Sequence, residues 1–235
     1  RKKLEIVKNI TPEELEKLVS KSKEKPSGKE EKTWTPEHEA DEVNVEIEEV
    51  KPDKIVTPDL TRQGGQTDPG EDKKPTTGYE TTEEKTSPDK KAIGEWGEKH
   101  VYHALQEKYK KLGTITETDS GFKAVNTSNE EFEIIWLNKH NDKGKGYDSV
   151  VKKNGAEIEY IEVKAKTQED AELIEVTGTQ WEFARYLFDK NEGEKYSFYV
   201  VLNAGKENAK IHILKNPVKL WQEGKLYAHP VNFKL

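Results

Sequence analysis

The sequence predicts an α/β fold, and two observations lead to this prediction. Apolar residues recur at helical spacing over residues 87–113, and a second segment with helical spacing lies at 177–191. Between and after these segments, short runs rich in β-branched and aromatic residues are typical of strands. The order of helix, strands, helix and strands favours one α/β domain over residues 89–235, a normal size for a single domain.

The region before this domain differs in composition. Thr11, followed by Glu14, favours a short helix over residues 10–25, and we expect residues 1–23 to be the helical tail of a preceding domain. Residues 24–88 are rich in Pro, Gly, Lys, Glu and Thr. Because so few apolar side chains cannot offset the entropy of ordering, we expect a largely disordered linker there.

One stretch within this expected linker has a different pattern. Residues 43–50 alternate apolar and acidic side chains, and Trp34 stands nearby. Two interpretations stay open. The stretch is either part of a polar linker with a few apolar residues, or a segment that docks on a partner or on the parent domain.

Local signals define the individual elements of the domain. Ser87 can cap the first helix, and Gly113 lies where the helix should stop. Asn154 and Gly155 are the preferred pair for a two-residue hairpin turn. A short helix is expected after Pro217. Strands are expected at 114–118, 122–126, 132–138, 147–153, 156–167, 173–177, 196–203 and 210–216.

The composition excludes several classes of function. The chain has no Cys, which rules out disulfides, thiolate zinc sites and a cysteine nucleophile. No apolar run is long enough to cross a bilayer and the N-terminus lacks a signal-peptide core, so we expect no membrane association and a cytoplasmic location. Because the chain also lacks Met and opens on Arg1, we expect it to be a fragment of a longer polypeptide.

The charge distribution bears on nucleic-acid binding. A net charge of −7 argues against a dominant nucleic-acid-binding surface, but most of the acidity lies in residues 1–90. The remainder is nearly neutral and can hold a local basic groove. The loop before Asp148 contains Lys139, His140, Lys143 and Lys145. Such a loop is either a solvated surface or a contact for the phosphate backbone.

Asp148, Glu162 and Lys164 form the candidate site. In a hairpin of near-ideal register, Asp148 lies beside Glu162, and the two carboxylates repel each other unless a cation joins them. Magnesium or manganese is the expected ion, since hard cations prefer oxygen ligands. Lys164 shares the face of Glu162 and can orient a water molecule. The alternative interpretation is a hairpin with charged residues on its solvent face.

Four separated motifs occur in order along the domain: IGEWGEKHVYHAL, GKGYDSV, YIEVKAKT and TQWEFARYL. Together they resemble the nuclease-like C-terminal domain of the NO VEIN type, within the PD-(D/E)XK nuclease superfamily. The resemblance covers about residues 91–220. It implies a restriction-endonuclease-like core, in which a mixed β-sheet is flanked by helices, and a metal-dependent hydrolysis of DNA phosphodiester bonds.

The resemblance also implies a role for individual residues. Asp148 and Glu162 occupy the positions of the metal ligands, and Lys164 occupies the position of the catalytic lysine. Glu98 in the first helix completes the acidic cluster. Glu95 is the alternative to Glu98, because residues three apart on a helix point in similar directions.

Further residues are weaker candidates. Those expected to contact DNA are Lys143, Lys145, Lys166 and Gln180. Gln180 matches a position that is often polar in related domains, but it can equally be a first-turn residue of a helix. Ala165 follows the lysine where the family pattern has glycine, so we expect a phosphate to approach this strand less closely. His100 and His103 have the spacing of a zinc-ligand pair, yet no third ligand is visible.

The resemblance extends to partners. Domains of this type are fused to helicases and to GHKL-type ATPases, so we expect a parent ATPase or helicase domain before this fragment, acting in defence against foreign DNA or in DNA processing. A homodimer is conceivable, because a duplex has two strands to cut. Two other hypotheses remain: a catalytically inactive module that binds nucleic acid or protein, and an interaction scaffold that uses the apolar residues of the linker.

Overall fold

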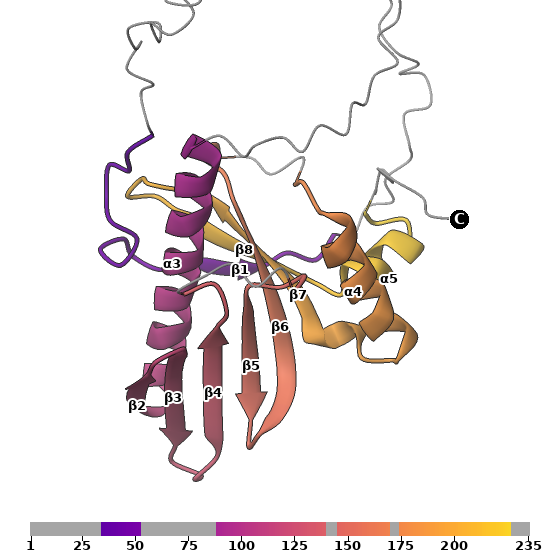
Figure 1. Cartoon of the computed structure of the whole chain (residues 1–235), viewed down its shortest axis with the longest axis horizontal. Coiled ribbons are helices and arrows are strands. Elements are labelled where there is room, and N and C mark those ends of the chain that lie inside the picture. The colour runs from indigo at the N-terminus through magenta and orange to yellow at the C-terminus, as the bar shows by residue number, and fades with distance from the viewer. Residues whose placement is uncertain (1–33, 53–87, 140–144, 170–173, 227–235) are drawn as a thin grey trace, which may run out of the picture. The chain divides into compact units, whose positions relative to one another are not determined.

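The structure, a computed structural model, describes residues 34–52, 88–139, 145–169 and 174–226 (Figure 1). These residues form one eight-stranded mixed sheet with three α-helices. The expected α/β class, with a mixed sheet flanked by helices, is therefore confirmed. The predicted helix over 10–25 and most of the predicted linker lie outside the described residues. None of the helices in the described part of the chain is long and apolar enough to span a membrane.

The elements follow the predicted order. The helices are α3 (Pro88–Lys110), α4 (Gly178–Asp189) and α5 (Pro217–Gln222), with a 3₁₀ turn η2 (Gly193–Lys195). The strands are β1 (Ile47–Glu49), β2 (Gly113–Thr118), β3 (Gly121–Asn126), β4 (Glu131–Trp136), β5 (Ser149–Lys153), β6 (Ala156–Ala165), β7 (Tyr196–Leu202) and β8 (Lys210–Lys215). The strand predicted at 173–177 is wrong for residues 174–177, which have no regular structure because Thr177 caps α4.

The pairing of neighbouring strands changes from antiparallel to parallel at the centre of the sheet. Strands β2 to β6 form an antiparallel meander, whereas β6 and β7 are parallel. A parallel pair needs a crossover connection, and α4 lies in that connection. The strand order is β1-β8-β7-β6-β5-β4-β3-β2. Strand β6 therefore lies next to both the antiparallel hairpin and the crossover helix, which brings α4 to the strand that carries Glu162 and Lys164.

Helices cover both faces of the central strands. One apolar cluster joins α3 to the sheet and includes Trp96, Val101, Leu105 and Ile161. The other joins α4 and α5 to the opposite face and includes Tyr160, Leu187, Phe198 and Val218. All seven residues of β7 are buried, as expected for a strand covered on both sides. Along β6, side chains therefore alternate between α3 and α4.

Residues 34–52 fold with the domain, which corrects the expectation of a linker throughout 24–88. Ala40 is fully buried and Val43 is 3% exposed, and both belong to the cluster under α3. Strand β1 pairs in parallel with β8 at the edge of the sheet. Ala40 and Val43, with the partly buried Trp34 and Val45, thus pack into the core of the domain itself, so the docking interpretation holds for this segment.

Two side chains of α3 hold this N-terminal segment. The Trp96 indole donates from Nε1 to the His38 carbonyl at 2.9 Å, and the His100 ring lies with Nδ1 2.8 Å from the Ala40 carbonyl. Because a carbonyl can only accept, His100 donates from Nδ1. Burial lowers the pKa of His100 and favours the neutral ring. His100 is thus a buried residue that holds the N-terminal segment, and in the described part of the chain it belongs to no group of three His, Cys, Asp or Glu side chains that could hold a zinc ion.

Candidate functional site

A cavity of about 280 Å³ lies where α3, the β5–β6 hairpin and the start of α4 meet. It contains three carboxylates, those of Glu98, Asp148 and Glu162. The other residues that line it are Asn138, Lys145, Gly146, Tyr147, Thr177, Thr179 and Gln180. The elements that meet here are far apart in the sequence, so the cavity is a product of the tertiary fold.

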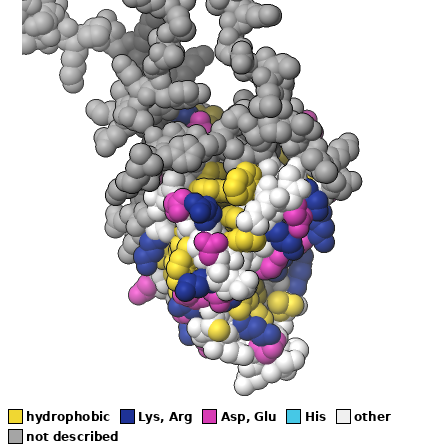
Figure 2. Space-filling model, turned by 90° about the vertical axis from the view of Figure 1, so that its right-hand side faces the viewer, with side chains coloured by type: hydrophobic (Ala, Val, Ile, Leu, Met, Phe, Trp, Pro, Cys, Tyr) yellow, Lys and Arg dark blue, Asp and Glu magenta, His cyan; other side chains and the backbone are white. Residues whose placement is uncertain are grey.

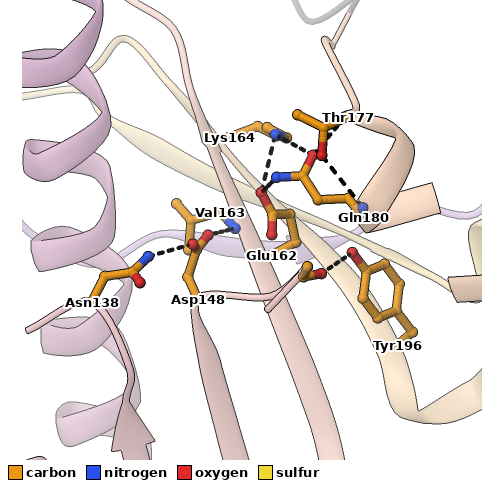
Figure 3. Close-up of polar contacts among 9 residues, drawn as sticks. Asn138, Asp148, Glu162, Val163, Lys164, Thr177, Gln180 and Tyr196 are labelled. Carbon is orange, nitrogen blue, oxygen red and sulfur yellow. Dashed lines mark hydrogen bonds and ion pairs between the residues drawn. The ribbon is translucent and has the colours of Figure 1, made fainter. Parts of the chain in front are cut away.

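Both oxygens of the Asp148 carboxylate accept hydrogen bonds (Figure 3). The Asn138 side chain donates to Oδ1 at 2.7 Å, and the backbone N–H of Val163 donates to Oδ2 at 2.7 Å. Asn138 follows β4 and Val163 belongs to β6, so the carboxylate is fixed between two strands. Such bonds favour the charged carboxylate and hold it in one orientation.

The Glu162 carboxylate is buried among polar partners, with its side chain only 3% exposed. Lys164 places Nζ 3.0 Å from Oε1, and the Gln180 amide donates to the same oxygen. Burial, together with the negative charge of Asp148, raises the pKa of Glu162 to about 8, and Lys164 acts in the opposite direction. The negative charges of Asp148 and Glu162 therefore repel each other in this cavity, and Lys164 is the positive side chain that pairs with Glu162.

Gln180 connects the start of α4 to these residues. Its side-chain oxygen accepts from Lys164 Nζ at 2.9 Å and from the Thr177 backbone N–H at 2.8 Å (Figure 3). Thr177 in turn accepts from the Gln180 backbone, which completes a capping box. Gln180 is thus both a first-turn residue and a cavity residue, so the two interpretations of this position are compatible.

The structure separates the two glutamates of α3. Glu98 lines the cavity and accepts a 2.8 Å hydrogen bond from the Trp136 indole. Glu95 instead forms an ion pair with Lys91 at 3.6 Å, and its side chain is 66% exposed. The geometry therefore favours Glu98 as the third acidic residue of the site.

The residues expected to contact DNA are only partly brought together. Lys145 and Gln180 line the cavity. Lys166 is half-buried and is not among the residues that line the cavity. Its backbone N–H donates to the Val201 carbonyl of β7. Lys143 lies outside the described residues.

Ala165 corrects an expectation about phosphate access. Its side chain faces α3, in the cluster on the opposite side of the sheet from Lys164. The methyl group therefore does not narrow the approach to the cavity.

Several lining residues were not among the predicted ones. Asn138 carries a visible signal, because it is a polar residue directly after an apolar strand. Thr177 carries another, the Thr-x-x-Gln pattern before a helix. Gly146 has a positive φ of 81°, and its carbonyl accepts from the buried Tyr196 hydroxyl at 2.9 Å. That contact depends on a residue fifty positions away and has no local signal.

The donor set suits a hard divalent cation. Asp148 and Glu162 offer carboxylate oxygens, the ligands that magnesium and manganese prefer. Within the described ranges, no three His, Cys, Asp or Glu side chains group closely enough to hold one ion together. Magnesium commonly uses one or two carboxylates and fills its other positions with water and substrate oxygens. The repulsion that raises the pKa of Glu162 is also what a cation would relieve.

A family profile described as "Protein NO VEIN, C-terminal" matches residues 97–214, half of the chain. The match includes α3 from Gly97 onward, the hairpin with the acidic residues, and α4. The chain belongs to the NO VEIN C-terminal family. All three carboxylates of the cavity lie within the matched segment of this NO VEIN C-terminal domain.

Two relatives from Arabidopsis thaliana are similar to this NO VEIN C-terminal domain. Protein NO VEIN is 36% identical over 93 residues, which cover 40% of this chain and 3% of that protein. Protein NO VEIN-LIKE is 35% identical over 93 residues, covering 40% of this chain and 13% of that protein. In both relatives the similar segment is thus a small part of a much longer protein. No solved structure matches the chain.

Proposed function

We propose that this domain is a metal-dependent endonuclease of the PD-(D/E)XK type that hydrolyses phosphodiester bonds in DNA. The observation that carries the proposal is the cavity in which Asp148, Glu162 and Glu98 meet, with Lys164 bonded to Glu162. An acidic residue on the first helix and an Asp followed by Glu-x-Lys on a hairpin form the pattern of that superfamily. The family membership supports the same function by resemblance.

Each side chain has a proposed role. Asp148 and Glu162 would hold magnesium or manganese. When bound, the metal ion would supply positive charge that offsets the negative charge developing on the phosphate. Lys164 lies within 3.0 Å of Glu162 and would orient the attacking water beside the phosphorus. Glu98, fixed by Trp136, would hold that water from the α3 side. Gln180 keeps Lys164 and Glu162 together.

The N-terminus of α4 and Lys145 favour an anionic substrate. Thr177, Thr179 and Gln180 bring the first turn of α4 to the cavity, and the positive end of a helix dipole attracts a phosphate. Lys145 adds a positive side chain at the rim. As part of the same proposal, a parent ATPase or helicase domain would deliver DNA to this site in the cytoplasm, and a dimer would cut both strands.

A second candidate function is a catalytically inactive module that binds nucleic acid or protein. Figure 2 shows positive and negative side chains interspersed on the face near α4 and α5, with apolar side chains between them. Such a surface does not produce the strong positive electrostatic potential that attracts DNA, unlike the basic surfaces that most DNA-binding proteins present. This candidate predicts binding without cleavage.

The test measures metal binding and DNA cleavage by the full chain. We expect calorimetry to detect Mg²⁺ or Mn²⁺ binding, and we expect nicking of supercoiled plasmid or cleavage of circular single-stranded DNA when the metal is present. Asp148→Asn and Glu162→Gln should each abolish both activities. Lys164→Ala should keep the metal but lose cleavage by at least about a hundredfold. Glu182→Gln, which removes an exposed carboxylate on α4, is the control and should change neither.

The outcomes separate the two candidates. Metal binding that depends on Asp148 and Glu162, together with cleavage that depends on Lys164, would establish the enzyme. DNA binding without metal binding or cleavage would leave the inactive module. Cleavage that survives in Asp148→Asn and Glu162→Gln would show a contaminating nuclease and overturn the assignment of this site.

A further inference from the structure

Helix α3 lies in close contact with strand β6 at Gly97. A Cβ atom at this position would lie 2.5 Å from the Cβ of Ala165 and 3.7 Å from a methyl carbon of Val163. Carbon atoms in contact normally lie about 3.5 to 4.0 Å apart, so a side chain at Gly97 has no room. Gly94, one turn earlier on the same helix, has no atom within 4 Å of the corresponding position.

This contact joins the two elements that carry the site. Glu98 directly follows Gly97 on α3, and Ala165 directly follows Lys164 on β6. Ala165 faces α3, whereas Lys164 and Glu162 face α4. Residues on one side of β6 thus set how near the helix lies, and residues on the other side hold the polar groups of the cavity.

We infer that Gly97 and Ala165 are positioning residues, whose contact sets the separation between Glu98 and the acidic pair Asp148 and Glu162. This inference rests on the proposed function. A methyl group at position 97 would push α3 about 1 Å or more from β6. This is the difference between the 2.5 Å at which the added carbon would lie from Ala165 Cβ and a normal carbon–carbon contact. Glu98 would move with the helix, because it is the next residue.

A displacement of this size matters for a catalytic site. Misplacing a group by about 1 Å can lower a rate by about a hundredfold, since the reacting atoms no longer meet in line. The bond from the Trp136 indole to Glu98 is 2.8 Å long and would lengthen by a similar amount. That indole therefore reports the position of Glu98 independently of any activity.

The experiment compares four full-length chains: wild type, Gly97→Ala, Gly94→Ala, and the double variant Gly97→Ala with Ala165→Gly. The double variant moves one methyl group from the strand to the helix and keeps the contact filled. Nuclear magnetic resonance follows the Trp136 indole N–H signal, which Trp136→Phe assigns. Calorimetry measures Mn²⁺ affinity, plasmid nicking measures cleavage, and thermal unfolding measures folding in each variant.

We expect Gly97→Ala to shift the Trp136 signal and to lower cleavage by about a hundredfold. Gly94→Ala should change none of these, since its methyl group meets no atom. The double variant should recover the wild-type signal and most of the activity. If Gly97→Ala alone does not fold, a double variant that folds and recovers the Trp136 signal still supports the inference.

Two results would overturn the inference, and a third would separate it from the proposed function. An unchanged Trp136 signal in folded Gly97→Ala would overturn it. A double variant that folds but does not recover the signal would show that the contact is not the cause. If wild type neither binds Mn²⁺ nor cleaves DNA, the proposed function fails, yet the Trp136 signal still tests whether the contact positions Glu98.

Discussion

Asp148 and Glu162 lie on the same face of the sheet because the β5–β6 hairpin contains a bulge at Ile158. The pairing skips Ile158, and Val150 therefore pairs with Tyr160. Side chains alternate along a strand, so Asp148 shares the face of Val150 and Glu162 shares the face of Tyr160. Without the bulge, Val150 would pair one residue earlier, and the two carboxylates would point to opposite faces.

Asn138→Ala is expected to weaken the site without unfolding the domain. The Asn138 side chain donates to Asp148 Oδ1 at 2.7 Å, and losing a partner that orients a metal ligand typically costs about ten- to a hundredfold in affinity. Calorimetry with Mn²⁺ measures the effect. Asn208→Ala removes an exposed asparagine away from the cavity and is the matched control. Equal affinities in all three chains would show that Asn138 does not support Asp148.

The sequence predicted the parts of this site that depend on local signals. The hairpin turn is one example, since Asn154 and Gly155 both have positive φ, 50° and 81°, as a type I′ turn requires. The cap of α4 has a local signal too, the Thr-x-x-Gln pattern, which the predicted strand at 173–177 overlooked. Local signals specify the turn and the cap because their geometry involves only neighbouring residues.

The parts that failed depend on distant contacts. Asp148 lies opposite Glu162 as expected, but through a bulge at Ile158 and not through a near-ideal register, and Ile158 looks like any other strand residue in the sequence. Strand β1 has three exposed residues and pairs with β8, which lies more than 150 residues later in the chain. Asn138 and Trp136 acquire their roles from groups on other elements. No pattern within one segment contains this information.

The stability of the metal-free protein is expected to fall as the pH rises from about 4.5 to about 8. The pKa of Glu162 is raised from 4.5 to about 8 by burial and by Asp148, so the folded state binds this proton more tightly than the unfolded state. This contribution to stability is complete below pH 4.5 and is lost as the pH approaches 8. Removing the carboxyl group removes the dependence.

Urea unfolding at several pH values in the presence of EDTA measures this effect. Wild type should lose on the order of 4 kcal/mol across that range through this group. Glu162→Gln should show a flatter profile and should be more stable than wild type at pH 8. Glu182→Gln serves as the control because its carboxylate is exposed. A wild-type profile that rises with pH across this window, unchanged by Glu162→Gln, would contradict the expected burial of a protonated carboxyl.

Gln180→Ala and Thr177→Ala should be separable by activity. Each breaks the capping box of α4, which contributes about 1 kcal/mol of stability. Only Gln180 also bonds to Glu162 and Lys164. We therefore expect similar losses of unfolding free energy, but a further loss of cleavage of at least about tenfold in Gln180→Ala alone. Equal cleavage by both variants would limit Gln180 to capping the helix.

Residues 34–52 are expected to be necessary for a stable domain. Removing them would expose the surface that Ala40 and Val43 cover and would leave the buried His100 ring without its carbonyl partner. The lost apolar burial and hydrogen bonds together should cost at least about 3 kcal/mol, a large share of the stability of a typical domain. A chain that begins at residue 53 should then unfold well below the temperature of a chain that begins at residue 34.

A chain that begins at residue 44 distinguishes the two halves of this segment. It keeps β1 and its pairing with β8 but loses the contacts of Trp96 and His100 with residues 38 and 40. Because Ala40 and Val43 are buried whereas all three residues of β1 are exposed, we expect this chain to be nearly as unstable as the one that begins at residue 53. Equal unfolding temperatures for all three chains would mean that the segment lies on the domain without stabilising it.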